Sequence, residues 1–266
     1  MQVLSRHGAR IAVTLIPLCF AVLHALGVFQ IGLFNRLDDL YYDARLRATL
    51  PATHDPRVVI VDIDEKSLAE LGQWPWPRDR LADLVDQLFD RQGIALLGLD
   101  TVFAEADQHS GLRQLQDLAT SELADVPGLS GRLEVLGPQL DPDQRLARAL
   151  RDRPVVLGYY FTSDRQGHTS GVLPPPVLRQ ADLAGRAMPA TRWTGFGANI
   201  APLAKAAPQA GFFNALADGD GVVRSLPLLA EHGGAYYESL ALAMFRRLQG
   251  LPRVEPDHGL SLIHIS

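Results

Sequence analysis

The stretch VVIVDIDEKSLAELGQWPWPRDRLADLVDQLFDRQGIALLGLD, residues 58–100, decides the fold. Its two ends, 58–63 and 94–99, are short apolar runs, which are typical of strands covered on both faces in a parallel sheet. Between them, residues 79–92 place leucine, valine and phenylalanine on one side of a helix. A strand, a helix and a second strand in this order predict a right-handed parallel unit. We therefore expect an α/β fold with a mostly parallel mixed sheet and flanking helices.

The remaining sequence predicts further helices and strands around this unit. Helices are expected at 38–50, 142–151 and 236–248, and strands at 155–161, 211–214 and 222–230. Residues 108–138 predict an irregular insertion that is partly helical, and residues 162–207, which are rich in proline and glycine, predict mostly loop.

Composition limits the function classes. Apolar residues make up 47% of the 266 residues, which is enough for a sizeable core, and the formal net charge is −5. This mild acidity does not favour nucleic acid as a partner, because proteins that bind nucleic acid carry basic patches. The single cysteine, Cys19, leaves no disulfide to form within the chain.

Residues 11–34 contain no Asp, Glu, Lys or Arg. As a helix of about 1.5 Å per residue, these 24 residues reach roughly 36 Å, enough for a hydrocarbon layer of about 30 Å. Arg6 and Arg10 precede the segment and Asp38 and Asp39 follow it, so residues 1–10 are predicted to stay in the cytoplasm. We expect one N-terminal transmembrane helix in the inner membrane, a partner in the lipid bilayer, and the rest of the chain on the periplasmic or extracellular side.

Residues 11–34 also allow two alternatives to a membrane anchor. A cleaved signal peptide has a shorter apolar core and a small-residue cleavage site, and the end of this segment offers no such site. A buried helix of a soluble protein is the other alternative, and the flanking charges favour the membrane.

Three aspartates follow the two runs that predict strands. Asp62 and Asp64 lie at the end of the first run and Asp100 follows the second, at the edge of an open sheet where ligands bind. Three carboxylates there could hold a divalent cation, and no other cofactor is expected. The structural alternative is that Asp64 caps a helix that begins near residue 66.

The spacing of Asp62 and Asp64 after an apolar strand also resembles the opening motif of haloacid-dehalogenase-like phosphatases. That resemblance implies Asp62 as the nucleophile beside a magnesium ion. The later Gly-Asp motif of that family is missing, because Gly219-Asp220 continues as Gly-Val-Val-Arg. A membrane-tethered phosphatase is therefore kept as an alternative function only.

Two tryptophans and an arginine stand together in the proline-stiffened segment 74–78. One interpretation is an aromatic wall with a guanidinium for a carboxylate or phosphate, which predicts a ligand site made by Asp62, Asp64, Trp76, Arg78 and Asp100. The alternative is a hydrophobic lid on the sheet, with Arg78 paired to one of these three aspartates.

The segment 218–224, DGDGVVR, contains two acids among glycines. A calcium loop requires more acids at fixed positions, whereas Asp-Gly beside apolar residues predicts a hairpin turn. We interpret Asp218, Asp220 and Arg224 as a structural turn in which the arginine reaches back to an aspartate.

Together, these segments resemble the type-two CHASE family, the cyclase- and histidine-kinase-associated sensory extracellular domains. The matching segments are DDLYYDARLR, VVIVDIDEKSLAELGQWPWPR, GLDTVFAEAD, GFFNALADGDGVVRSLPLL and YYESLALAMFRRL. The resemblance implies a sensor domain over 37–256 in a bacterial signalling receptor. It also implies a cytoplasmic output domain in the full-length protein: an adenylate or guanylate cyclase, a histidine kinase or a cyclic-di-GMP enzyme.

The resemblance also sets expectations about the chain's limits and partners. The sensor is expected to be incomplete, with 257–266 as an anomalous tail and the chain as a C-terminally truncated fragment. No catalytic residues are assigned in the chain itself. The expected partners are an unidentified small-molecule or ionic signal and a second copy in a homodimer; a purely structural dimerisation module is a further alternative.

Overall fold

The computed structural model describes residues 2–26, 28, 32–51, 53, 55–107, 111–183, 185, 188–256 and 263–265. The chain divides into two compact units, Met1–Ile63 and Asp64–Ser266, and each is described by itself. Part of the predicted membrane segment, 27 and 29–31, and most of the predicted tail, 257–262 and 266, lie outside the described residues.

The first unit contains two helices, α1 (Gln2–Ala25) and α2 (Gly32–Thr49). The helix predicted at 38–50 is confirmed as part of α2. The segment 11–34 is shared between α1 and α2, because α1 ends at Ala25 and α2 begins at Gly32. Within the part of the chain that the structure describes, no helix combines the length and the apolar character that a membrane crossing requires. The transmembrane helix at 11–34 therefore stays a prediction.

The strand predicted at 58–63 is wrong. These residues belong to no strand, and Ile60 is 88% exposed. A strand is stabilised by the backbone hydrogen bonds of a neighbour, and no described strand pairs with this run. The parallel unit predicted from 58–63 and 94–99 is consequently replaced by one in which the second run, as β1 (Leu97–Leu99), pairs with a later strand.

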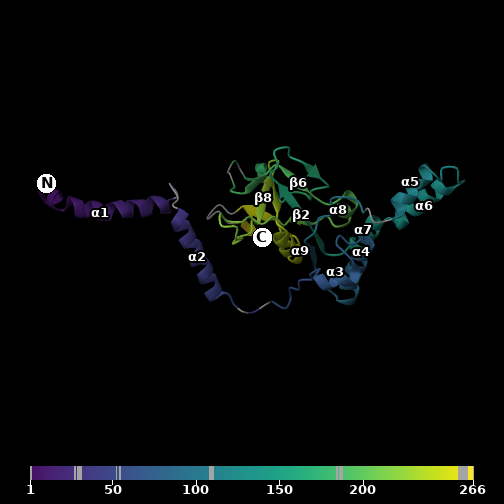
Figure 1. The fold of residues 1–266 in the computed structure, drawn as a ribbon, viewed down its shortest axis with the longest axis horizontal. Helices are drawn as coiled ribbons and strands as arrows, with labels where there is room; N and C mark the ends of the chain where they lie inside the picture. Colours follow the sequence, from purple (N-terminus) through teal and green to yellow (C-terminus); the bar gives the residue numbers. More distant parts are fainter. Residues whose placement is uncertain are drawn as a thin grey trace. The chain divides into compact units, whose positions relative to one another are not determined.

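The main sheet of the second unit is built around β2 (Val155–Thr162), which confirms the strand predicted there (Figure 1). On its two edges lie β1 and β7 (Ala210–Phe212), both parallel to it. At the far end of β2, β6 (Gly195–Gly197) pairs antiparallel, and β3 (Thr169–Ser170) pairs parallel to β6. The predicted mixed α/β class with a parallel core is confirmed.

A second sheet has four short strands in the order β4 (Leu178–Arg179), β9 (Ala235–Glu238), β8 (Leu229–His232) and β5 (Thr191–Trp193). β8 and β9 form a hairpin through the turn at Gly233 and Gly234. The helix predicted at 236–248 begins later, because Ser239 caps α9 (Leu240–Leu248) and leaves the tyrosines in β9. β10 (Val254–Pro256) and β11 (Ile263–Ile265) form a separate antiparallel pair.

The other helices of the second unit flank the main sheet or extend from it. They are α3 (Glu65–Leu71), α4 (Arg78–Asp86) with the π-helical turn η1 (Gln87–Arg91), α5 (Gly111–Thr120), α6 (Leu129–Leu140), α7 (Pro142–Leu150), the 3₁₀ turn η2 (Gln180–Leu183) and α8 (Ala201–Ala206). Helix α7 packs against both α4 and α8. The helices predicted at 79–92 and 142–151 are confirmed.

The segment 108–138 is more regular than predicted. It forms α5 and α6, which contact each other. The signal was the spacing of Leu112, Leu115 and Leu118, which places three leucines on one side of a helix.

The core is continuous from β2 to the helices. Val155, Val156 and Leu157 of β2 and Leu146 and Leu203 of the flanking helices are fully buried. Gly211 in β7 permits a close approach of the next layer, because a Cβ there would lie 2.5 Å from the backbone of Leu240. The start of α9 is therefore held directly against β7.

Candidate functional site

One of the two tryptophans predicted as an aromatic wall is part of the core, and the other is exposed. Trp76 is buried, and its indole N–H donates a 2.7 Å hydrogen bond to the carbonyl of Gly72. The ring of Trp74 lies edge-on to that of Trp76, with 6.1 Å between their centroids. A buried indole with a satisfied N–H favours the lid interpretation over a ligand-binding wall.

Arg78 contacts groups that the sequence did not indicate. Its guanidinium lies over the ring of Phe103, 4.4 Å from the centroid, and its Nε lies 3.4 Å from the Asp143 carboxylate. Its backbone N–H donates to Asp107 Oδ2 at 2.7 Å, and the Asp107 N–H donates to Asp143 Oδ2 at 2.9 Å. The expected pairing of Arg78 with Asp62, Asp64 or Asp100 is thus replaced by a cluster with Asp107 and Asp143.

Both carboxylates of this cluster are largely buried. Burial raises the pKa of Asp143, against the opposing effects of the Asp107 N–H and the Arg78 charge. The cluster links the start of α4, the loop after β1 and the start of α7. Neither Asp107 nor Asp143 was predicted, and the only signal was Asp141-Pro142, which marks the beginning of the helix that carries Asp143.

The three predicted aspartates differ in what surrounds them. Asp64 is the N-cap of α3, and its carboxylate accepts hydrogen bonds from the Ser67 N–H at 2.8 Å and the Ser67 hydroxyl at 2.7 Å. These bonds lower the pKa of Asp64. Asp62 and Asp100 are exposed, and Asp62 belongs to the first unit.

No group of three or more His, Cys, Asp or Glu side chains within the described residues is arranged to hold a metal ion. The assignment of Asp62, Asp64, Trp76, Arg78 and Asp100 to one ligand site stays a prediction, and the contacts of Asp64, Trp76 and Arg78 favour the structural alternative for these three.

The DGDGVVR segment forms the expected contact between its arginine and its aspartates. Arg224 Nη1 donates to Asp218 Oδ2 at 3.0 Å, and its Nη2 donates to Asp220 Oδ2 at 2.7 Å. The turn closes through the Gly221 N–H, which donates to the carbonyl of Asp218. The guanidinium beside Asp220 lowers the pKa of that carboxyl to about 2.

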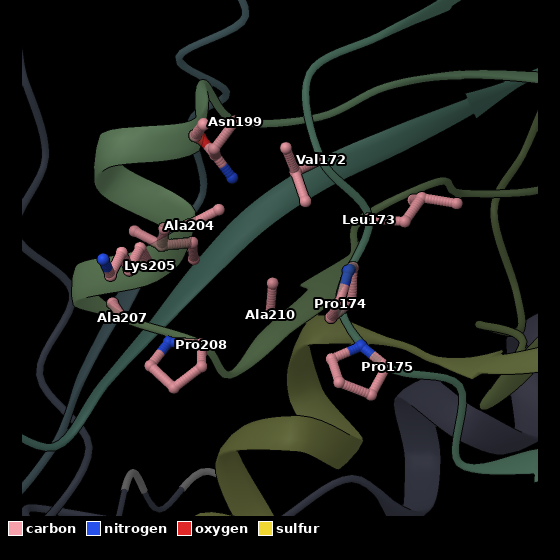
Figure 2. Close-up of a pocket in the computed structure, with 12 residues that line it drawn as sticks. Val172, Leu173, Pro174, Pro175, Asn199, Ala204, Lys205, Ala207, Pro208 and Ala210 are labelled. Carbon is pink, nitrogen blue, oxygen red and sulfur yellow. The ribbon is translucent and has the colours of Figure 1, made fainter.

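A hollow of about 550 Å³ lies between α8 and the segment after β3; we call it the alanine–proline pocket. Figure 2 shows Leu173, Pro174 and Pro175 on one side and Ala204 and Lys205 of α8 on the other, with Ala210 between them in this view. Small alanines leave the space, and prolines with fixed φ stiffen its wall.

Asn199 holds one wall of this pocket in place through three hydrogen bonds. Its Oδ1 accepts a 2.8 Å hydrogen bond from the Phe103 N–H, and its Nδ2 donates to the carbonyl of Gly158 at 2.9 Å. Its own carbonyl accepts from the Val172 N–H at 2.9 Å. Asn199 thereby ties together the loop after β1, strand β2 and the pocket wall, and a single asparagine in a predicted loop gave no signal of this role.

The comparisons with known proteins gave one result. The family model described as "CHASE2 domain" matches residues 18–263. Neither the search of curated proteins nor the search of solved structures gave a match.

The match covers more than nine-tenths of the chain and includes all five segments that carry the resemblance, among them the tryptophan segment and the DGDG turn. The chain therefore belongs to the CHASE2 domain family, a family of extracellular sensory domains.

Proposed function

We propose that this chain is the signal-input region of a bacterial transmembrane receptor, placed on the extracytoplasmic side of the inner membrane. In the full-length receptor it controls a cytoplasmic output domain: a cyclase, a histidine kinase or a cyclic-di-GMP enzyme. The observation that carries this proposal is the family match over residues 18–263. A bound signal alters the output only if it binds two conformations of the receptor unequally.

The membrane anchor belongs to the same proposal. The uncharged segment 11–34 spans the bilayer, with Arg6 and Arg10 on the cytoplasmic side and Asp38 and Asp39 outside. The asymmetry of basic residues sets this orientation, because lysine and arginine are retained on the cytoplasmic side of bacterial membranes.

The test is the position of the C-terminus relative to the membrane. We expect a reporter enzyme that is active only in the periplasm, fused after Ser266, to be active, and a reporter active only in the cytoplasm to be silent. Arg6→Glu together with Arg10→Glu should reduce the periplasmic signal, whereas Arg165→Glu, far along the sequence from the anchor, should not. A silent periplasmic fusion with an active cytoplasmic one would exclude the proposed orientation.

Helix α2 supports a homodimer as the assembled form. Leu33, Leu37, Leu40 and Ala44 recur at alternating spacings of four and three residues, which is the apolar spacing of a two-stranded coiled coil. The three leucines are exposed. A second copy of this helix would cover the stripe.

Sedimentation equilibrium of the full chain tests the dimer. Leu37→Glu with Leu40→Glu should shift the mass toward the monomer, because two charges would face the partner helix. Leu46→Glu, on the opposite side of α2, is the matched control and should leave the mass unchanged. Equal masses for both variants would exclude this helix as the dimer contact.

A further inference from the structure

Two hollows of opposite chemistry adjoin on the second unit. The alanine–proline pocket has a volume of about 550 Å³. A second hollow of about 1020 Å³, which we call the arginine hollow, lies between the ends of α7, α8 and α9. The two share Ala201, Lys205 and Pro208 in their linings, so they adjoin along α8.

The alanine–proline pocket suits an apolar body. Its lining is hydrocarbon except for Asn199 and Lys205. The Asn199 side chain already accepts a hydrogen bond from the Phe103 N–H and donates one to the Gly158 carbonyl. It therefore stabilises the pocket wall and is not the group that binds a ligand. Pockets of this size, largely apolar and with few polar groups, are typical ligand sites.

The arginine hollow suits an anion. Arg151, Lys205 and Arg247 line it, and none of the three forms an ion pair or a side-chain hydrogen bond with any other described residue. Arg153 is also in the lining, but its guanidinium is committed to Asp86 and Asp90 at 2.6 and 2.9 Å. Asp152 is the one carboxylate among the lining residues.

Each of the three cations lies near the C-terminal end of a helix, where the helix dipole stabilises a positive charge. That effect explains why a cation is tolerated at each end. It does not supply acceptors for the N–H groups, and an anionic group in the hollow would supply them.

Lys205 connects the two hollows. Its aliphatic stem lies along α8, and Figure 2 shows its nitrogen on the side of the pocket away from Leu173 and Pro174. A long side chain of this kind can cover apolar surface with its stem while its ammonium group faces a charged partner.

We propose that the two hollows together form a binding site for an amphipathic monocarboxylate, with the apolar chain in the alanine–proline pocket and the carboxylate in the arginine hollow beside Lys205. This inference rests on the proposed sensory function and names the chemical class of its signal. The site is separate from the five residues predicted from the sequence, none of which lines either hollow.

The chemistry predicts two separable contributions to affinity. Each additional buried CH₂ group should tighten binding about fourfold until the pocket is full. The carboxylate should add only a factor of about two to five per exposed cation, because such ion pairs are screened by water.

Equilibrium dialysis of the full chain against butanoate, hexanoate and octanoate tests the site, with octan-1-ol as the neutral partner of octanoate. We expect affinity to rise along the series and octanoate to bind more tightly than octan-1-ol. Lys205→Gln with Arg151→Gln and Arg247→Gln should remove the preference for the carboxylate and leave the chain-length dependence in place. Lys66→Gln, an exposed helical lysine outside both hollows, should change neither.

Two variants fill the pocket from opposite sides. Ala204→Leu and Val172→Phe should each weaken octanoate binding at least tenfold, whereas Ala69→Leu on exposed α3 should not. The melting temperature of each variant is measured alongside to show that it folds. If Ala204→Leu does not fold, octanoate binding by Val172→Phe tests the pocket. Undetectable octanoate binding, affinity independent of chain length, octan-1-ol binding as tightly as octanoate, or full binding by a folded filled variant would overturn the proposal.

A failure of the ligand proposal can be distinguished from a failure of the proposed sensory function. Failure to bind octanoate together with an active periplasmic fusion would overturn the ligand class alone. Binding as expected in a chain whose C-terminus lies in the cytoplasm would overturn the extracytoplasmic placement alone.

Discussion

Residues 58–63, VVIVDI, and 155–161, VVLGYYF, are similar as sequence and opposite in environment. Both are short apolar runs that begin with two valines, and both predict a buried strand. Val155, Val156 and Leu157 are fully buried in β2, whereas Val59 is 77% exposed and lies in no strand. The difference shows that the two runs share a local preference and differ in their neighbours.

Strand β2 is surrounded by other elements of the second unit. Strands β1 and β7 pair with it on its two edges, and α9 packs against it. Strand preference describes how well a residue fits a pleated, half-buried surface. A residue with a high strand preference therefore stabilises the folded protein only where neighbouring strands and helices provide such a surface. We expect substitutions in the two runs to differ in cost accordingly.

Among substitutions that only remove atoms from a side chain, the largest expected effect is that of Phe161→Ala. Phe161 is buried in the aromatic cluster, with its ring 5.3 Å from that of Tyr159, 5.7 Å from Phe212 and 5.8 Å from Tyr237. Removing the ring leaves a cavity, and such changes cost about 3–5 kcal/mol of unfolding free energy. Urea unfolding measures the loss.

The matched control is Phe245→Ala, because Phe245 lies on α9 with half of its surface exposed. Its loss should be well below that of Phe161→Ala. Equal losses would mean that burial in this structure does not decide the cost of losing a ring.

The sequence predicted the class of the fold and most elements whose spacing is regular, such as α4, α7 and β2. It could not predict which strand pairs with which, since β2 and 58–63 carry the same local signal. The helix predicted from the sequence also included β9, because Tyr236 and Tyr237 continue the helical spacing of α9 toward the N-terminus. In the structure, Ser239 is the N-cap of α9, so the helix begins only after the tyrosines. Pairing and capping depend on the rest of the chain, and a single segment does not contain that information.

The second effect is a gain of stability within β2. The Tyr159 hydroxyl is buried and has no hydrogen-bond partner among the described residues. Burial raises the pKa of Tyr159 well above its ordinary value. Because a buried polar group without a partner costs free energy, Tyr159→Phe should raise the unfolding free energy by about 1 kcal/mol.

Thermal unfolding measures this gain, with Tyr41→Phe as the control, because Tyr41 is exposed and its hydroxyl reaches water. A loss of stability for Tyr159→Phe would reveal a partner for the buried hydroxyl, and would make β2 a strand that is held by polar contacts as well as packing.

The third effect is local and lies directly after the exposed run. Asp64→Ala removes the acceptor of the Ser67 N–H, so the Ser67 amide should exchange its hydrogen several-fold faster. Asp64→Asn keeps an acceptor and should retain most of the protection. Amide hydrogen exchange followed by NMR distinguishes the two variants from the parent.

This cap should also depend on pH. The pKa of Asp64 is lowered below its ordinary value of 3.8 in the folded protein. Its stabilising effect is therefore complete above that value and is lost as the pH falls through the lowered pKa. Protection of Ser67 that is unchanged in Asp64→Ala would show that the carboxylate is not the cap, and would return Asp64 to the predicted ligand group.

The candidate site was less predictable than the fold. Asp62, Asp64 and Asp100 were selected because aspartates follow apolar runs, yet the same position also favours helix caps, which is the role Asp64 has. The partners of Arg78, Asp107 and Asp143, are 29 and 65 residues further along the chain. The cations of the arginine hollow come from three helices, so no short motif could contain them.

The smallest expected effect tests the difference in burial between the run 58–63 and strand β2. Val59→Asp introduces a charge into an exposed, unpaired run, and exposed substitutions of this kind change the unfolding free energy by less than about 0.5 kcal/mol. The equivalent change in β2, Val156→Asp, buries an unpaired carboxylate and should abolish cooperative unfolding. Urea unfolding of both variants, at one pH and salt concentration, gives the comparison directly. A loss of several kcal/mol for Val59→Asp would mean that the run is buried in solution, because only burial makes a carboxylate so costly, and the buried environment that the sequence predicted for 58–63 would then exist.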